Sequence, residues 1–230
     1  MEPEITDLCE FLVKMGAKID GIGTNTLKVT GVKKLKSISY TIMPDRIEAG
    51  TFLVAGAITR GNIIINNANP DHLKPVIYKL EEAGAEIKTL KNSVQLKMQK
   101  RPNALELKTL PYPGFPTDMQ AIFGSLLVVS KGTSTITENI FENRFKYAGE
   151  LIRMGAKIKQ EGNLLIIDGR KKLTGTKVRS TDLRGGVSLI LAGLYAKGET
   201  QVDNINYILR GYEKIDKKLQ NIGADIRLIR

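Results

Sequence analysis

Three stretches of this sequence are apolar around the whole circumference of a helix. They are Phe52–Ile58, Ala121–Val129 and Val187–Ala196. A helix without a polar face is usually buried on all sides, so we expect these three helices to form the centre of the fold. A glycine follows shortly after each stretch and would end the helix in the left-handed conformation.

Each apolar helix is followed by a β-rich run and then by an amphipathic helix. The β-rich runs are residues 62–65, 133–136 and 200–202. One amphipathic helix is Val76–Ala83, where Ile77 and Leu80 lie on one stripe and charged residues cover the remaining surface. Two short strands close the unit, such as Ala156–Lys159 and Leu164–Ile167, and the glycine between them is typical of a hairpin turn.

A short Gly-Ala signature recurs four times along the chain. Its glycines are Gly16, Gly84, Gly155 and Gly223, separated by 68, 71 and 68 residues. Four copies at nearly constant spacing indicate an internal repeat, whose unit reads strand–helix–strand–helix–strand–strand. We therefore expect an α/β (α+β) fold in which three units surround a common core with pseudo-threefold symmetry. Residues 4–15 are the amphipathic helix of a further unit, so we expect the sequence to begin inside a repeat.

The composition is that of an ordinary globular protein, with 42% hydrophobic and 26% charged residues in a chain of 230. The longest apolar runs are too short to span a membrane, and no signal-peptide pattern opens the chain. The single cysteine, Cys9, leaves no partner for a disulfide within these residues and favours a reducing compartment. We therefore expect a cytoplasmic protein without a membrane partner.

A formal net charge of +11 indicates an anionic partner, either nucleic acid or a phosphorylated small molecule. The basic residues are scattered and are not interleaved with aromatic residues. Aromatic residues make up 6% of the sequence, without tryptophan, so stacking platforms for single-stranded nucleic acid are scarce. We expect no nucleic-acid partner, although a solvated lysine-rich surface explains many of these charges equally well.

An aspartate lies in the loop before each apolar helix, at Asp45, Asp118 and Asp182. Aspartate in this position commonly caps the helix N-terminus, and that role accounts for Asp45 and Asp182. Asp118 differs because it follows the stretch Tyr112–Thr117, whose two prolines stiffen the backbone and would fix the direction of the carboxylate. Asp118 is therefore a candidate functional residue.

Three arginines occupy loops of the same kind. Arg144 and Arg210 precede expected amphipathic helices, and Arg184 begins an apolar helix. The helix dipole disfavours a cation at a helix N-terminus, whereas guanidinium groups match carboxylates and phosphates. The three together indicate a site for an anionic ligand, while a surface ion pair is the simpler explanation for any one of them.

The sequence argues against several other kinds of site. With one histidine, His72, and one cysteine, Cys9, neither a histidine-based triad nor a Cys/His metal site can be assembled from these residues. Cys9 falls on the apolar stripe of its helix, so we expect it in the core. The glycine-rich stretch Gly21–Thr26 lies in a hairpin position, whereas a nucleotide-binding loop joins a strand to a helix.

Six short motifs occur in the order known from one protein family. They are Glu2–Ile5, Pro44–Glu48, Pro116–Ala121, Thr137–Phe145, Thr181–Arg184 and Arg210–Glu213. With them the whole chain resembles the enolpyruvyl transferases, and among these the UDP-N-acetylglucosamine 1-carboxyvinyltransferases. The resemblance implies an inside-out α/β barrel architecture with two domains of three repeats and a substrate cleft between them. It places the end of the first domain in residues 1–43 and the second domain in residues 44–230.

The same resemblance implies a reaction. An enolpyruvyl group would move from phosphoenolpyruvate to the 3-hydroxyl of UDP-N-acetylglucosamine with release of phosphate, the first committed step of peptidoglycan synthesis. Asp118 would act as the base near this hydroxyl, while Arg144 and Arg184 would hold the carboxylate of phosphoenolpyruvate. Arg210 would hold the phosphate, and the backbone of Ile140 would contact the UDP-sugar. No cofactor and no metal is implied.

Part of the family's site belongs to sequence that is absent here, namely a lysine, a loop cysteine and a loop arginine. Cys9 does not match that cysteine. We therefore expect a fragment whose partners are the two substrates and the N-terminal half. The alternatives are a non-catalytic repeat module that binds an anion or a partner protein, and an RNA-processing relative, which the charge alone favours.

Overall fold

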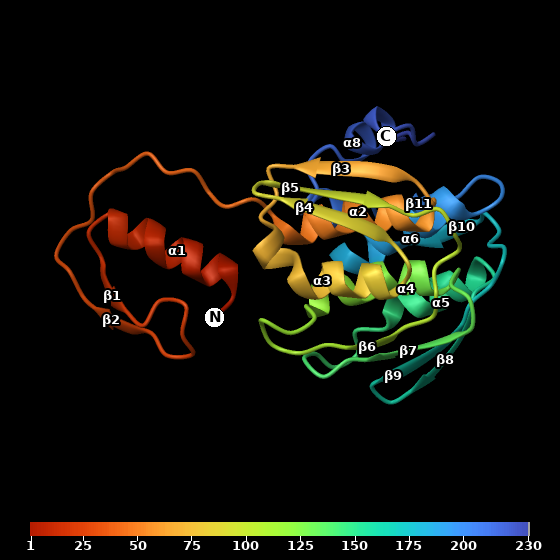
Figure 1. Ribbon diagram of the computed structural model, residues 1–230, viewed down its shortest axis with the longest axis horizontal. Helices are drawn as coiled ribbons and strands as arrows, with labels where there is room; N and C mark the ends of the chain where they lie inside the picture. Colours follow the sequence, from red (N-terminus) through yellow and green to blue (C-terminus); the bar gives the residue numbers. More distant parts are fainter. Residues whose placement is uncertain (230) are drawn as a thin grey trace.

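Residues 1–43, here called the N-terminal segment, lie beside the rest of the chain (Figure 1). The computed structural model describes residues 1–229. The segment contains helix α1 (Pro3–Lys14) and the antiparallel strands β1 (Lys18–Asp20) and β2 (Lys28–Thr30), which confirms the expected helix and hairpin. Cys9 is buried in α1, as expected. Residues 31–45 form neither helix nor strand and lead into helix α2. Residues 44–229 are here called the body.

Three apolar helices form the centre of the body, as the hydrophobic pattern predicts. They are α2 (Arg46–Ile58), α4 (Gln120–Leu127) and α6 (Leu183–Tyr195). The three helices contact one another, and most of their side chains are buried. Two of them begin several residues earlier than the apolar stretches, because the carboxylates of Asp45 and Asp182 cap their first turns. The capping role expected for these two aspartates is therefore confirmed.

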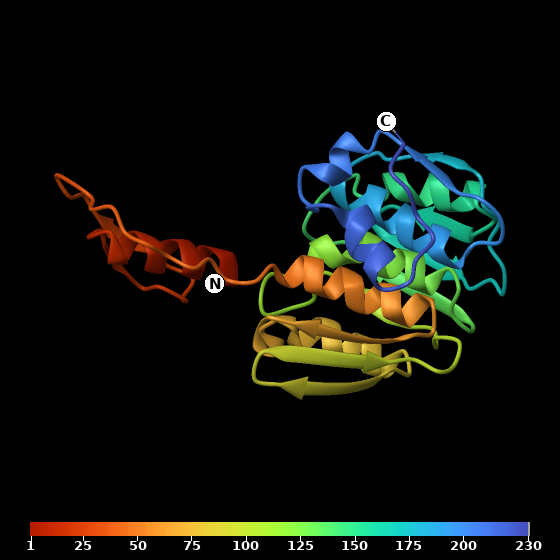
Figure 2. The ribbon, with the colours of Figure 1, turned by 90° about the horizontal axis from the view of Figure 1, so that it is seen from above.

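The helices lie between sheets on opposite sides of the body (Figure 2). One sheet has the antiparallel order β3-β5-β4, and a second has the order β6-β7-β9-β8, with only β6 and β7 parallel. Strands β10 and β11 form a parallel pair. The bounds are β3 (Asn62–Asn66), β4 (Glu86–Leu90), β5 (Ser93–Lys97), β6 (Glu106–Lys108), β7 (Thr133–Thr137), β8 (Lys157–Glu161), β9 (Leu164–Asp168), β10 (Lys177–Arg179) and β11 (Gln201–Asp203).

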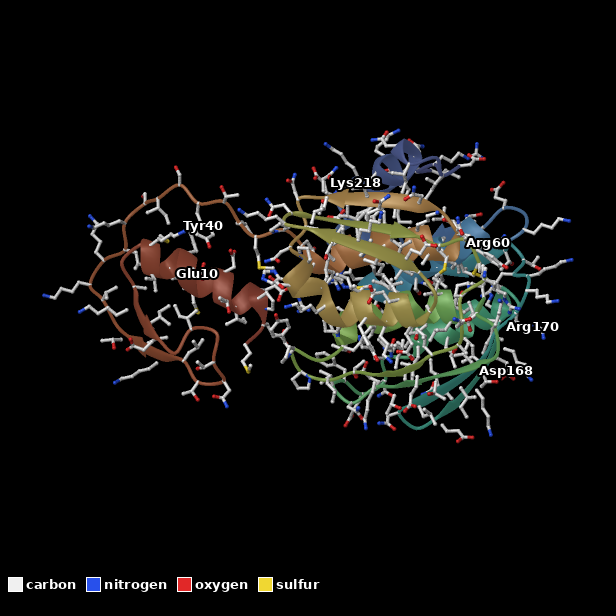
Figure 3. All side chains as sticks on the ribbon, viewed as in Figure 1. Glu10, Tyr40, Arg60, Asp168, Arg170 and Lys218 are labelled. Atoms are coloured by element: carbon white, nitrogen blue, oxygen red, sulfur yellow. The ribbon has the colours of Figure 1, made fainter. Side chains whose placement is uncertain are left out.

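The remaining helices lie outside the central three. They are α3 (Pro70–Glu82), the 3-10 turn η1 (Thr117–Met119), α5 (Lys146–Arg153), α7 (Asn206–Leu209) and α8 (Ile215–Asn221). In α3 the stripe containing Ile77 and Leu80 is buried, which confirms the amphipathic pattern. Lys218 on α8 donates a 2.6 Å hydrogen bond to Glu48 on α2 (Figure 3). No helix within residues 1–229 combines the length and the apolar character needed to cross a membrane.

The expected unit is complete only in the middle of the chain, where β6, α4, β7, α5, β8 and β9 follow in order. Residues 31–45, directly before α2, form no strand, so the sheet that contains β3 has three strands. After α8, residues 224–229 carry no strand assignment. The α/β class is confirmed, whereas the expected six-element unit does not appear in full three times.

The Gly-Ala signature has a single local cause. Its glycines have φ between 95° and 106°, a left-handed conformation that residues with a Cβ adopt only under strain. The first of them, Gly16, follows α1, and its counterparts likewise end the outer helices. At the end of α2 the expectation is wrong, because Arg60 and not Gly61 takes the left-handed conformation, with φ 56°.

Candidate active site

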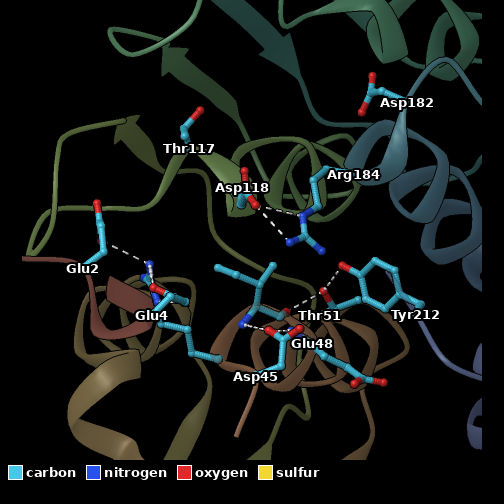
Figure 4. A network of polar contacts seen from close by, with 12 residues as sticks. Glu2, Glu4, Asp45, Glu48, Thr51, Thr117, Asp118, Asp182, Arg184 and Tyr212 are labelled. Carbon is cyan, nitrogen blue, oxygen red and sulfur yellow. Dashed lines mark hydrogen bonds and ion pairs between the residues drawn. The ribbon is translucent and has the colours of Figure 1, made fainter. Parts of the chain in front are cut away.

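Asp118 lies on η1, the turn that leads into α4. Its Oδ1 accepts a hydrogen bond from Arg144 Nη2 at 2.5 Å. Its Oδ2 accepts hydrogen bonds from Arg184 Nε at 3.1 Å and Nη2 at 2.9 Å (Figure 4). The loops before α4 and α5 and the first turn of α6 thus bring three of the predicted site residues into direct contact.

Arg144 has two further contacts that fix its guanidinium group. Its Nη1 donates a hydrogen bond to the hydroxyl of Thr117 at 2.7 Å. Its guanidinium carbon lies 4.9 Å from the centre of the Phe141 ring. Because Thr117 and Asp118 are adjacent, the two ends of the guanidinium fork bind neighbouring residues, so Arg144 has one well-defined orientation.

Arg184 is held from the opposite side by an aromatic ring. Its guanidinium carbon lies 5.4 Å from the centre of the Tyr212 ring, and the hydroxyl of Tyr212 lies 2.8 Å from that of Thr51 on α2 (Figure 4). The Nη1 atom of Arg184 is buried and has no hydrogen-bond partner within residues 1–229. Arg184 therefore keeps one donor unused.

The two arginines control the protonation of Asp118. Burial by itself raises the pKa of this carboxyl group, but the charge of Arg184 and the hydrogen bond and charge of Arg144 outweigh it, so the pKa lies below its usual value. Asp118 is therefore ionised at neutral pH. While both arginines are bound to it, it is a weak base.

We expect the pH dependence of the carboxyl ¹³C shift of Asp118 to reveal this lowered pKa. The ion pairs stabilise the fold above the pKa of an unfolded aspartate, and this stabilisation disappears as the pH falls through the lower folded-state pKa. Replacing Arg184 by glutamine removes one cation, so the pKa of Asp118 should rise. A titration unaffected by this substitution would contradict the interpretation.

A cavity of about 580 Å³ opens beside Asp118. Its walls include Asp118 and Arg184, the loop between β6 and η1, the start of α2 and the first residues of the N-terminal segment. Ile140 belongs to the same wall. Four of the five predicted site residues, Asp118, Ile140, Arg144 and Arg184, therefore lie at or directly behind one cavity.

Arg46 joins the N-terminal segment to the body at the edge of this cavity. Its Nε lies 2.8 Å from Glu4 Oε1, and its Nη2 lies 3.3 Å from Glu2 Oε2. Its guanidinium carbon lies 5.4 Å from the centre of the Tyr112 ring. Its side chain is only 10% exposed. Arg46 was not among the predicted site residues, although its place directly after the cap residue Asp45 was a signal for it.

Arg210, the fifth predicted residue, lies apart from these contacts. Its side chain is exposed and makes no ion pair or hydrogen bond in the part of the chain that the structure describes. It lies in the loop before α8, as expected, and it is at the same time the C-terminal cap residue of the short helix α7. The dipole favours a cation there, so its helix position gives no indication of an anionic ligand. The turn also carries Tyr212, which contacts Arg184.

Comparison with known proteins identifies the class to which this fold belongs. A family model described as EPSP synthase (3-phosphoshikimate 1-carboxyvinyltransferase) matches residues 1–219. The fold is thus that of the carboxyvinyltransferase class of protein, and the solved enolpyruvyl transferase NikO from Streptomyces tendae has a similar structure, with a TM-score of 0.88 and 28% identity over 99% of this chain and 55% of that one. The chain belongs to the EPSP synthase family.

Two curated relatives specify the resemblance further. The chain is 52% identical to a UDP-N-acetylglucosamine 1-carboxyvinyltransferase of Geobacter metallireducens, over 100% of this chain and 55% of the relative. It is 54% identical to UDP-N-acetylglucosamine 1-carboxyvinyltransferase 2 of Caldanaerobacter subterraneus, over 98% of this chain and 54% of the relative. An EPSP synthase from Acinetobacter baumannii, at 19% identity and a TM-score of 0.75, shares the fold. The chain spans about half the length of the curated relatives it matches.

Proposed function

We propose that this chain is the C-terminal part of an enzyme that transfers the enolpyruvyl group of phosphoenolpyruvate to the 3-hydroxyl of UDP-N-acetylglucosamine, releasing phosphate. The observation that supports it most is the cavity wall on which Asp118 lies between Arg144 and Arg184. One base and two forked cations suit a reaction between a hydroxyl group and a small dianionic substrate. The names of the relatives agree with these substrates.

Each predicted residue has a role in this proposal. Arg144 and Arg184 hold the carboxylate of phosphoenolpyruvate. Arg210, on the turn that follows α7, holds the phosphate. The backbone of Ile140 contacts the UDP-sugar from the cavity wall. Fixed cations orient the substrate and stabilise the charge that develops during addition to its double bond.

Substrate binding also activates Asp118 in this proposal. In the structure its carboxylate occupies hydrogen-bonding sites on the two arginines that the substrate carboxylate would use. When the substrate carboxylate binds the arginines, Asp118 loses their stabilisation and its pKa rises. The carboxylate that leaves the arginines is then a stronger base, beside the sugar hydroxyl from which it takes the proton.

The finer architecture is part of the same proposal. We take residues 1–43 as the end of a first domain and residues 44–230 as a second domain of three related units around α2, α4 and α6, in an inside-out α/β barrel. The mutual contacts of the three helices and the sheets on either side of them support this arrangement. Peptidoglycan synthesis in the cytoplasm is the corresponding cellular role.

The N-terminal half is the partner that this architecture requires. A groove of about 1370 Å³ lies between β3, β11 and residues 222–229. Both strands present an edge to it, since β3 is the outer strand of its sheet and β11 pairs only with β10 in the described residues. An open edge offers unpaired N–H and C=O groups to an added strand. We propose that the N-terminal half supplies that strand.

A binding titration of the purified chain tests the proposed function. We expect amide NMR shifts of Asp118, Arg144 and Arg184 to change with phosphoenolpyruvate and those around Ile140 to change with UDP-N-acetylglucosamine. Glycerol 3-phosphate serves as the matched control, because it has the phosphate but lacks the carboxylate. Equal responses to both phosphates would favour a non-catalytic anion-binding module. A response only to a single-stranded RNA oligonucleotide would favour the RNA-processing alternative.

A further inference from the structure

Behind the candidate site lies a carboxylate to which the proposed reaction gives no role. Glu138 directly follows β7, is 3% exposed and does not line the cavity. Its Oε1 accepts hydrogen bonds from the Thr109 hydroxyl at 2.8 Å and from the backbone N–H groups of Ile140 at 2.8 Å and Phe141 at 3.2 Å. Its Oε2 accepts one from the Thr117 hydroxyl at 2.8 Å.

Glu138 forms no salt bridge in the described residues, so these four hydrogen bonds are what stabilises its carboxylate. Burying a carboxylate is costly unless hydrogen bonds replace its hydration. All four donors come from three loops that surround the site: the end of β6, the start of η1 and the segment after β7. The carboxylate therefore joins these loops at one point.

The geometry also fixes the direction of one hydrogen bond. Arginine can only donate, so the Thr117 hydroxyl accepts from Arg144 and donates its single proton to Glu138. A lone pair of the same oxygen is then directed at Arg144 Nη1, 2.7 Å away. The chain from Arg144 through Thr117 to Glu138 runs donor to acceptor throughout, which strengthens both bonds.

We propose that Glu138 is a positioning residue of this site. Through Thr117 it holds Arg144 in the orientation that receives a carboxylate. Through the N–H of Ile140 it also holds the backbone of the cavity wall at that residue. This inference rests on the proposed function for the identity of the ligand, but the positioning itself is a property of the ligand-free chain. It assigns Glu138 no contact with substrate and no proton transfer.

The first test uses the ligand-free chain and the NMR signals of the Arg144 side chain. In the wild type the paired guanidinium group should rotate slowly about its Nε–Cζ bond. Thr117→Val has nearly the same shape but no hydroxyl, and Glu138→Gln keeps an acceptor for the backbone amides but loses the charge. Both substitutions should accelerate the rotation about tenfold, the effect of losing one charge-assisted hydrogen bond. Thr117→Ser keeps the hydroxyl and should rotate as slowly as the wild type. Unchanged rotation in Thr117→Val would overturn the proposal.

The second test measures the dissociation constant of phosphoenolpyruvate for the same variants. We expect it to rise about tenfold in Thr117→Val and Glu138→Gln and to stay within about twofold in Thr117→Ser. Thermal unfolding shows whether each variant is folded. If Glu138→Gln does not fold, the affinity of Thr117→Val alone tests the positioning role. A wild-type chain that shows slow Arg144 rotation but does not bind phosphoenolpyruvate would overturn the proposed function and leave the positioning role standing. Unchanged affinity in a folded Thr117→Val protein would overturn the positioning role.

Discussion

Replacing Asp118 by asparagine should lower turnover about 10²–10⁴-fold, the usual contribution of a general base, in a complex of this chain with the proposed N-terminal half. Asparagine keeps the size of the side chain and one acceptor oxygen for the arginines, but it cannot take a proton from the sugar hydroxyl. The affinity for UDP-N-acetylglucosamine should change less than about threefold, since the loss belongs to the transition state. Phosphate release and equilibrium binding measure the two quantities separately.

The matched control is Asp168→Asn. Asp168 lies at the end of the body away from the N-terminal segment (Figure 3) and pairs with Lys157. This variant removes the same charge without touching the cavity, so turnover should be unchanged. If Asp118→Asn retained wild-type turnover, or if both variants lost it equally, Asp118 would have no role as the base.

The chain by itself should release no measurable phosphate from the two substrates. In the proposed function the N-terminal half supplies one wall of the cleft, so without that half water would screen every charge contact and the nucleophile would not be held in place. Orientation of that kind is worth about 7–11 kcal/mol, or on the order of 10⁵-fold or more in rate. Adding the separately expressed N-terminal part of the Geobacter metallireducens relative should restore turnover. Turnover by the chain alone would show that the cleft is complete without it.

A substitution on β11 tests how the two halves combine. Gln201 donates its N–H to Thr176, and Asp203 accepts from Ser180, so both face β10. The N–H of Val202, between them, faces the open edge, because alternate residues point to opposite sides of a strand. Val202→Pro should therefore prevent the N-terminal part from restoring turnover without breaking the β10–β11 pair. In the Val202→Ala variant the N-terminal part should still restore turnover. Equal turnover of both variants after addition of the N-terminal part would exclude strand addition at β11.

Much of the fold could be predicted because its signals are local. The apolar stretches predict α2, α4 and α6, since burial of a whole helix leaves no position for a polar face. The repeated glycines predict helix ends because each needs a left-handed conformation. Complete sheets could not be predicted in the same way, because pairing depends on strands far away in the chain. Residues 224–229 illustrate this, since they follow a Gly-Ala signature without forming a paired strand.

The site was predictable only as far as its residues stand out in the sequence. Asp118, Arg144 and Arg184 do so, because an aspartate after a stiff loop and arginines near helix starts are unusual. Glu138 does not, because a buried carboxylate and an exposed one look alike in a sequence until the four donors around it are known. Arg210 also precedes a predicted helix, α8, but the short helix α7 that ends directly before it was not predicted.

The attachment of the N-terminal segment has a mechanical consequence. In the described residues its ion pairs to the body lie at one end of α1, where Glu2 and Glu4 bind Arg46, and the only covalent link is the irregular stretch 31–45. Glu10 and Tyr40 lie farther out along the segment (Figure 3). The segment is therefore attached to the body at one end, and the point of attachment lies beside the cavity. A small rotation about Arg46 displaces the far end widely, while the cavity mouth, close to the axis, moves little.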